Sequence, residues 1–163
     1  MRLAVLLSFL AVIFSGCGPE AKKPTAREAF EATEKLLSVK YKDIKAEYIR
    51  VLISEGADVN ARDTDGLTPL MIAAKFSSTP EIVQLLLEKG AEVNATSTDG
   101  WTPLMSAARY SSTPEIVQLL IEKGAELEAR STAGSTPLMV AARNTNGKSA
   151  EIKQLLIDAG ATE

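Results

Sequence analysis

Apolar side chains recur along most of this chain with the spacing of amphipathic helices. Residues 116–121 read Ile-Val-Gln-Leu-Leu-Ile, and residues 82–87 read Ile-Val-Gln-Leu-Leu-Leu. Residues three and four apart lie on the same side of a helix, so each run predicts a short helix with a broad buried face. Glycine is expected to end these helices, because it adopts the left-handed conformation common after a helix terminus. The residues in that place are Gly90, Gly124 and Gly160.

A second, shorter helix is predicted ahead of each of these runs. Thr102 and Pro103 form a typical helix start, because a threonine side chain can cap the first turn and proline lacks only an N–H that has no partner there. Apolar residues at helical spacing mark the buried face of this helix: Leu104, Ala107 and Ala108. Thr113 and Pro114 repeat the same start for the helix that follows. The unit therefore consists of two short helices.

This two-helix unit occurs three times at a fixed period. Gly66, Gly100 and Gly134 open the copies and are 34 residues apart. Thr-Pro-Leu follows each glycine at the same offset, at residues 68–70, 102–104 and 136–138. A fixed period of this length predicts a solenoid of stacked repeats, in which each unit buries its apolar face against its neighbours.

The repeated segments resemble the ankyrin repeat. The segments that carry the resemblance are Thr-Pro-Leu-Met-Ile-Ala-Ala from Thr68, Glu-Ile-Val-Gln-Leu-Leu-Leu from Glu81 and Gly-Ala-Asp-Val-Asn-Ala from Gly56. The resemblance implies an all-α ankyrin-repeat solenoid of stacked helix-turn-helix units with projecting β-turns. Two features depart from the family pattern. Met71, Met105 and Met139 replace the family's histidine, and a Ser-Ser-Thr-Pro linker replaces its Gly-His.

Four repeats are expected, at residues 25–61, 62–95, 96–129 and 130–163. The first is degenerate because it lacks Thr-Pro-Leu, and its charged outer surface is typical of an N-terminal capping repeat. Two apolar stripes are expected to form its buried faces. The first comprises Ala29, Phe30, Thr33, Leu36 and Leu37, and the second Ile44, Tyr48, Val51 and Leu52. In the last repeat, Lys153 takes the place of Val83 and Val117. We therefore expect stacking to end there and the chain to be complete.

The N-terminus has the pattern of a secretory signal. Met1 and Arg2 precede Leu3–Phe14, in which only Ser8 is polar. As a helix this run would be about 18 Å long, short of the roughly 30 Å of a bilayer's hydrocarbon core. We therefore expect residues 1–16 to be a signal peptide rather than a membrane span.

The segment Ser15-Gly16-Cys17 resembles the lipobox of bacterial lipoproteins, although Phe14 stands where that family usually has leucine. The resemblance implies that Cys17 is the lipid-attachment site on a bacterial membrane. Residues 18–24 lack an apolar period, so residues 17–24 are expected to form a flexible tether for the domain. The domain would then face the periplasm or the cell exterior. The alternatives are an ordinary cleaved signal with an unpaired cysteine, or a cysteine in the core.

Composition excludes several classes of chemistry. The chain has no histidine and one cysteine, so Ser-His-Asp and Cys-His catalysis and nearly all zinc-site patterns are absent. The net charge is −3, so nucleic acid is not an expected partner. We expect a protein that is not an enzyme and has no cofactor, metal or small-molecule substrate.

Stacking places equivalent residues in columns, and the columns outside the core are candidates for binding. In the ankyrin family the turn tips and first helices line a concave binding face. The residues of this chain that match those positions are Leu67, Lys75, Phe76, Trp101, Arg109, Tyr110 and Arg143, with Ser135 and Asn144 completing two of the columns. Trp, Tyr and Arg are enriched in binding hot spots. The pattern predicts another protein as partner, with an acidic patch facing the basic column formed by Lys75, Arg109 and Arg143.

Three alternatives concern these residues and their neighbours. The aromatic residues could instead fill space between turns, which would suit a structural envelope lipoprotein without a specific ligand. The three methionines could suggest a copper(I) site, but layers about 8 to 10 Å apart favour core packing. Asp65 and Asp99 could suggest a catalytic carboxylate pair, but their position in turns favours a turn-forming role.

Overall fold

The computed structural model describes residues 24–38 and 45–162. These residues form eight helices and no strand. Their bounds are α2 Ala26–Ser38, α3 Ala46–Ser54, α4 Pro69–Phe76, α5 Pro80–Glu88, α6 Pro103–Tyr110, α7 Pro114–Glu122, α8 Pro137–Ala141 and α9 Ser149–Asp158. In this part of the chain, no helix combines the length and apolar character that crossing a bilayer requires. The expected signal peptide, the lipid attachment at Cys17 and Ile44 lie outside the described residues.

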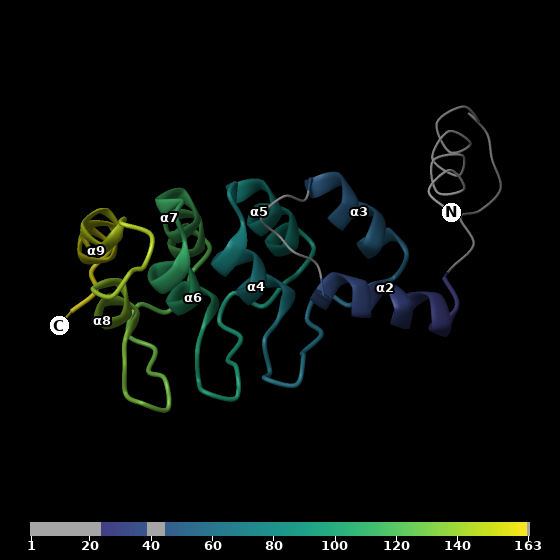
Figure 1. The fold of residues 1–163 in the computed structure, drawn as a ribbon, viewed down its shortest axis with the longest axis horizontal. Helices are drawn as coiled ribbons and strands as arrows, with labels where there is room; N and C mark the ends of the chain where they lie inside the picture. Colours follow the sequence, from purple (N-terminus) through teal and green to yellow (C-terminus); the bar gives the residue numbers. More distant parts are fainter. Residues whose placement is uncertain (1–23, 39–44, 163) are drawn as a thin grey trace.

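The helices form two layers along one axis (Figure 1). The inner layer contains α2, α4, α6 and α8, and the outer layer contains α3, α5, α7 and α9. Each inner helix packs on the outer helix that follows it, and neighbouring pairs pack against one another. The core between the layers is built from the predicted apolar faces, including Leu104, Ala107, Ile116 and Leu120, all fully buried. The predicted all-α solenoid is confirmed.

The predicted start of the inner helices is confirmed. Thr68, Thr102 and Thr136 each accept a hydrogen bond on the side-chain oxygen from the backbone N–H three residues later, at 3.4, 3.2 and 3.3 Å. Proline occupies the first turn in each case. These threonines are buried, so the bond satisfies a helix N–H that water cannot reach.

The outer helices begin differently from our expectation. α5 and α7 start at Pro80 and Pro114, but the side chains of Thr79 and Thr113 make no capping hydrogen bond. The hydroxyl of Thr113 donates instead to the carbonyl oxygen of Ser78 in the preceding repeat, at 3.3 Å. The predicted side-chain cap is therefore wrong for both helices, and at α7 the threonine hydroxyl links two repeats instead.

The first repeat buries a narrower face than the apolar pattern indicates. Phe30 is 66% exposed and Tyr48 is 42% exposed, whereas Ala32, Leu36, Ile49 and Leu52 are buried. Our assignment of the two aromatic residues to buried stripes is therefore wrong. The reason is position in the stack, since α2 and α3 have a neighbouring helix pair, α4 and α5, on one side. A cap therefore buries a thinner stripe than an internal repeat.

The start of α2 carries a capping box that our sequence analysis did not identify. The backbone N–H and hydroxyl of Thr25 each donate to the Glu28 carboxylate at 2.7 Å, and the N–H of Glu28 donates to the Thr25 hydroxyl at 3.3 Å. The signal was legible in the sequence, because threonine followed three residues later by glutamate is the pattern of this motif.

The methionine column is part of the core in two of its three positions. Met71 and Met105 are buried, but Met139 is 45% exposed. Core packing is therefore confirmed for the first two and wrong for Met139, because α8 lies in the last layer of the stack (Figure 1). Val83 and Val117 are fully buried, whereas Lys153 is partly exposed.

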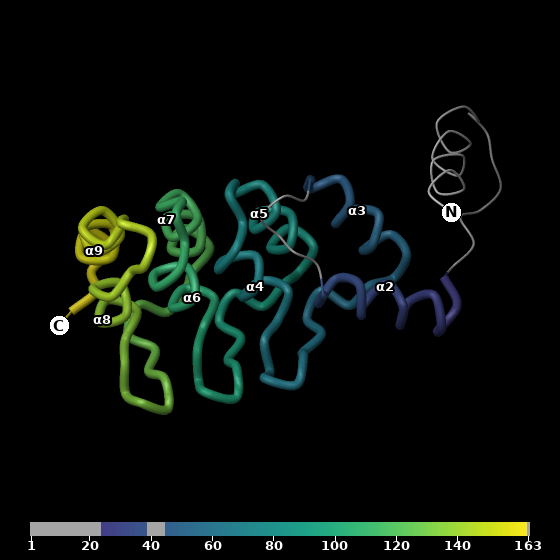
Figure 2. Tube along the Cα trace, viewed as in Figure 1, coloured from purple at the N-terminus to yellow at the C-terminus, as the bar shows by residue number. Residues whose placement is uncertain are grey.

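Three tight turns project on the same side of the inner helices (Figure 2). The N–H groups of Gly66, Gly100 and Gly134 donate to the carbonyl oxygens three residues earlier, at 3.0, 2.9 and 2.8 Å. Neighbouring turns are joined, because Thr98 donates to the carbonyl of Asp65 from its N–H at 3.1 Å and from its hydroxyl at 2.8 Å. Thr132 makes the same pair of bonds to Asp99. Asp65 and Asp99 are thus turn residues, as expected.

Candidate functional site

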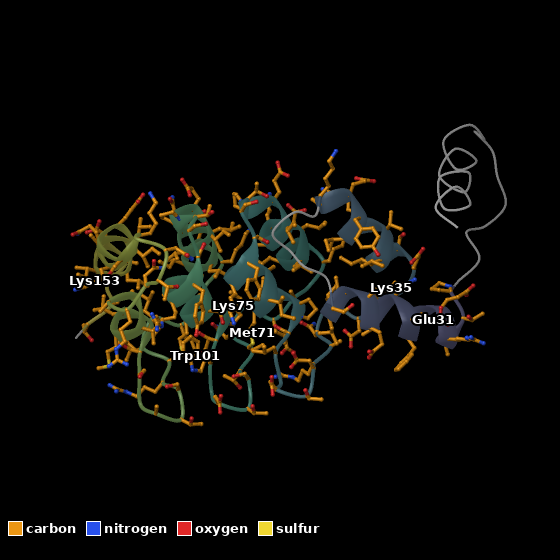
Figure 3. The ribbon with its side chains drawn as sticks, viewed as in Figure 1. Glu31, Lys35, Met71, Lys75, Trp101 and Lys153 are labelled. Atoms are coloured by element: carbon orange, nitrogen blue, oxygen red, sulfur yellow. The ribbon has the colours of Figure 1, made fainter. Side chains whose placement is uncertain are left out.

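A hollow of about 410 Å³ lies where the turns at Gly66 and Gly100 meet α4 and α6. Figure 3 shows Met71, Lys75 and Trp101 close together in this region. The lining combines apolar and aromatic side chains with three charged ones. The residues are Asp65, Leu67, Met71, Ile72, Lys75, Phe76, Ser97, Asp99, Trp101, Ser106 and Tyr110. Concave sites of mixed apolar and polar lining are the usual form of binding sites.

Trp101 is held in this hollow from two sides. Its ring is stacked on that of Tyr110, with centroids 5.9 Å apart and an interplanar angle of 26°. Its backbone N–H donates to the hydroxyl of Ser97 at 3.1 Å. The indole is half-buried and packs against the core. The turn and the end of α6 therefore fix the chain's single tryptophan before any partner arrives.

Lys75 lies between two aromatic rings. Its ammonium nitrogen is 4.8 Å from the centroid of Phe76 and 4.6 Å from that of Tyr110. The guanidinium carbon of Arg109 is 5.5 Å from the Tyr110 centroid. Cations at these distances are attracted to the face of a ring, by about 0.5 to 1 kcal/mol at exposed sites. The lysine charge is thereby kept in one place at the surface of the hollow.

A second hollow, of about 480 Å³, adjoins the first. It shares Lys75, Phe76 and Tyr110 with the first hollow and is otherwise lined by uncharged polar residues, namely Ser77, Ser78, Ser112, Thr145 and Asn146. We refer to the two hollows together as the concave groove. One end of the groove lies at the turns and the other at the C-terminal ends of α4 and α6.

The structure brings together five of the seven predicted binding residues. Leu67, Lys75, Phe76, Trp101 and Tyr110 all line the concave groove. Arg109 approaches the Tyr110 ring but lines neither hollow, and Arg143 is an exposed residue beyond the end of α8 that also lines neither. Of the three residues in the predicted basic column, only Lys75 therefore lines the groove.

Sequence reasoning missed the acidic part of the lining. Asp65 and Asp99 line the same hollow as Lys75, so the groove is not uniformly basic. The sequence suggests only a catalytic pair or a turn-forming role for these residues. A signal was present, because they stand two positions before Leu67 and Trp101 in the same turns. Residues so close in a tight turn share its exposed edge.

The third member of the Phe76 and Tyr110 column has a structural role. The side-chain amide of Asn144 donates to the carbonyl oxygens of Ala108 at 3.0 Å and Ser111 at 3.2 Å. The side-chain amide of Asn146 donates to the carbonyl of Tyr110. Asn144 and Asn146 therefore satisfy carbonyl groups at the end of α6, which otherwise lack a partner. They fix the backbone that carries Tyr110.

The family comparison agrees with this architecture. A sequence profile described as ankyrin repeats (3 copies) matches residues 35–131 and again 92–162. The chain belongs to the ankyrin-repeat family. Ankyrin-repeat proteins are in general non-enzymatic modules that bind other proteins. A search of curated proteins finds no match to the sequence of this ankyrin-repeat protein.

Proposed function

We propose that this ankyrin-repeat protein is a lipid-anchored component of a bacterial cell envelope and binds a partner protein in the concave groove. The observation that carries the proposal is the ordered array of Trp101, Tyr110, Lys75 and Phe76 across two repeats. The expected anchor is Cys17, which follows Ser15-Gly16 at the end of the apolar N-terminal run. The domain would face the periplasm or the cell exterior.

The array is suited to binding because its members are fixed in advance. Large aromatic side chains bury much apolar area, and immobilising a flexible side chain on binding costs about 0.5 to 1.5 kcal/mol. Here Tyr110 is already stacked on Trp101 and approached by two cations. Phe76 is 50% exposed and offers apolar surface that a partner can cover.

The positive charges in and beside the groove support an acidic group on the partner. Lys75 presents its ammonium group in the middle of the groove, and Arg109 and Arg143 add positive charge outside it. Opposite charges at the edge of an interface mainly speed association, and salt screens them. We therefore expect an acidic patch on the partner and salt-sensitive binding.

One observation favours a structural role instead. Trp101 is half-buried against the core, as expected for a residue that fills space between turns. A structural envelope lipoprotein without a specific ligand would use the same packing. The two functions differ in what contacts Phe76, since a filler role leaves this exposed ring without a partner in the cell.

Site-specific photocrosslinking in intact cells tests the proposal. A photoreactive amino acid in place of Phe76 should capture one partner. The same amino acid in place of Glu122, which is exposed on the outer helix α7, should not capture that partner. The captured partner is then titrated against a Trp101→Ala, Tyr110→Ala double variant. Each truncation should weaken binding by about 2 kcal/mol or more. Unchanged affinity in a folded double variant would show that the groove is not the binding site.

A further inference from the structure

We infer that the concave groove binds an extended segment of its partner that carries a basic side chain at the turn end and an acidic side chain over Lys75. This inference rests on the proposed function, because it specifies the partner chemistry of the same groove. It goes beyond an acidic partner patch, since it assigns a cation-binding end to the groove as well. The evidence is the separation of charge along the lining.

The turn end of the groove is acidic and fixed in place. Asp65 and Asp99 belong to neighbouring turns, and both are exposed and line the hollow. Their backbone carbonyls are held by Thr98 and Thr132, so the two side chains start from ordered positions. Among the described residues, no ion pair involves either carboxylate. Two like charges lining one hollow favour a cation from the partner.

The middle of the groove binds the acidic side chain of the partner. Lys75 is held by the faces of Phe76 and Tyr110 rather than by the aspartates of the turns. A ring face attracts a cation without neutralising its charge, so the ammonium group still attracts a carboxylate. Beyond Lys75 the lining is uncharged, with Ser112, Thr145 and Asn146. The groove thus presents negative, positive and neutral regions in order.

The spacing of the two regions sets how far apart the two charges lie in an extended segment. α4 runs between these two regions and contains eight residues, which corresponds to about 12 Å at 1.5 Å per residue. An extended chain covers that length in about four residues at roughly 3.3 Å each. We therefore expect the basic and acidic residues to be separated by about three to five positions in the partner. An apolar residue between them would contact Leu67, Ile72 and Trp101, which line the intervening surface.

Selection of a displayed library of random linear peptides on the purified full-length protein in detergent micelles tests the inference. Enriched peptides should contain a basic residue, an apolar residue and an acidic residue at this spacing. Peptides with the same composition but adjacent charges should bind about two- to fivefold more weakly, because one of the two charges would lose its counterpart.

Variants test which charge of the peptide each region of the groove binds. The Asp65→Asn, Asp99→Asn double variant should weaken an enriched peptide about three- to tenfold. The matched control is Glu81→Gln, Glu115→Gln, which removes the same charge from the outer helices and should have no effect. Lys75→Met should weaken the peptide similarly, and Lys123→Met should not. Lys75→Glu should recover affinity when the acidic residue of the peptide is changed to lysine.

The outcomes separate this inference from the proposed function. Peptides that require Trp101 and Tyr110 but ignore the aspartate and lysine variants would overturn the charge assignment and leave the groove as the binding site. Enrichment of no peptide would overturn the extended segment and leave a folded partner surface as the occupant. Failure of the Phe76 crosslink, with peptides indifferent to Trp101→Ala, would overturn both.

Discussion

Trp101 and Tyr110 stack at 5.9 Å although one follows a projecting turn and the other ends helix α6. The contact joins a turn to the end of a helix. It therefore positions the groove's largest side chain at little cost when a partner binds. The same contact also protects the indole, which makes the tryptophan a reporter of the groove.

Removing the Tyr110 ring should expose Trp101. We expect Tyr110→Ala to shift tryptophan emission to longer wavelength and to increase quenching by acrylamide, because the indole loses its stacked neighbour. The chain has one tryptophan, so the signal is unambiguous. Tyr110→Phe keeps the ring and should behave like the wild type. Equal quenching of all three proteins would contradict the stacked arrangement.

Adding a methyl group at Gly66 should cost more than adding it at Gly134. Both glycines have positive φ, 73° and 74°, so alanine is strained by about 1 kcal/mol at either position. At Gly66 the added Cβ would also stand 2.9 Å from the backbone nitrogen of Thr98, whereas at Gly134 nothing lies within 4 Å. We expect urea unfolding to show a loss of about 1 kcal/mol for Gly134→Ala and about 3 kcal/mol for Gly66→Ala. Equal losses would mean that the turns do not pack as described.

Ser77 and Ser111 occupy equivalent buried positions but differ in bonding. The Ser111 hydroxyl donates to the carbonyl of Thr113 at 3.1 Å and accepts from its N–H at 3.0 Å. In the described residues, the Ser77 hydroxyl oxygen is the one buried side-chain nitrogen or oxygen atom without a hydrogen-bond partner. Ser111→Ala should therefore destabilise the protein by about 1 to 2 kcal/mol, and Ser77→Ala should be neutral or stabilising. Urea midpoints decide the comparison, and a larger loss for Ser77→Ala would show that its hydroxyl is bonded in solution.

The fold was predictable because stacking repeats one local pattern. Thr-Pro starts, apolar runs and terminal glycines recur at one period, so an error in one copy is corrected by the others. The copies no longer agree with one another at the ends of the stack. Phe30, Tyr48 and Met139 are exposed although the pattern assigns them to buried faces. Their burial depends on whether a neighbouring layer covers them, and helical periodicity does not report that.

The sequence predicts which columns of equivalent residues line the site, but not every residue in it. Period and family resemblance place Leu67, Phe76, Trp101 and Tyr110 on one surface, as found. They do not show which charges join them. Lys75 reaches the groove because two rings hold it, and Asp65 and Asp99 reach it because their turns pack side by side. Such side-chain directions depend on contacts between repeats.

Cys17 should carry the lipid anchor. We expect the wild type to partition into the detergent phase and to incorporate labelled fatty acid, because each buried CH₂ contributes about 0.8 kcal/mol to membrane binding. Cys17→Ala should incorporate none. Fatty-acid labelling is the decisive measurement, since an uncleaved signal peptide could hold the variant in the detergent phase. A wild type without label that is found in the aqueous phase would instead support an ordinary cleaved signal.

Val117 and Lys153 occupy equivalent positions in successive repeats, and substitutions there test the register of the stack. Val117 is fully buried between repeats, so Val117→Lys would place an ammonium group in the core without a partner. Such burial is strongly unfavourable, and we expect a loss of roughly 2 to 4 kcal/mol in urea unfolding. Lys153 is partly exposed in the last layer, so Lys153→Val should leave stability nearly unchanged. It should lower solubility, because it adds an apolar side chain to a layer that already exposes Met139 and Ile157. If Val117→Lys unfolds at the same urea concentration as the wild type, the register that aligns these positions is wrong.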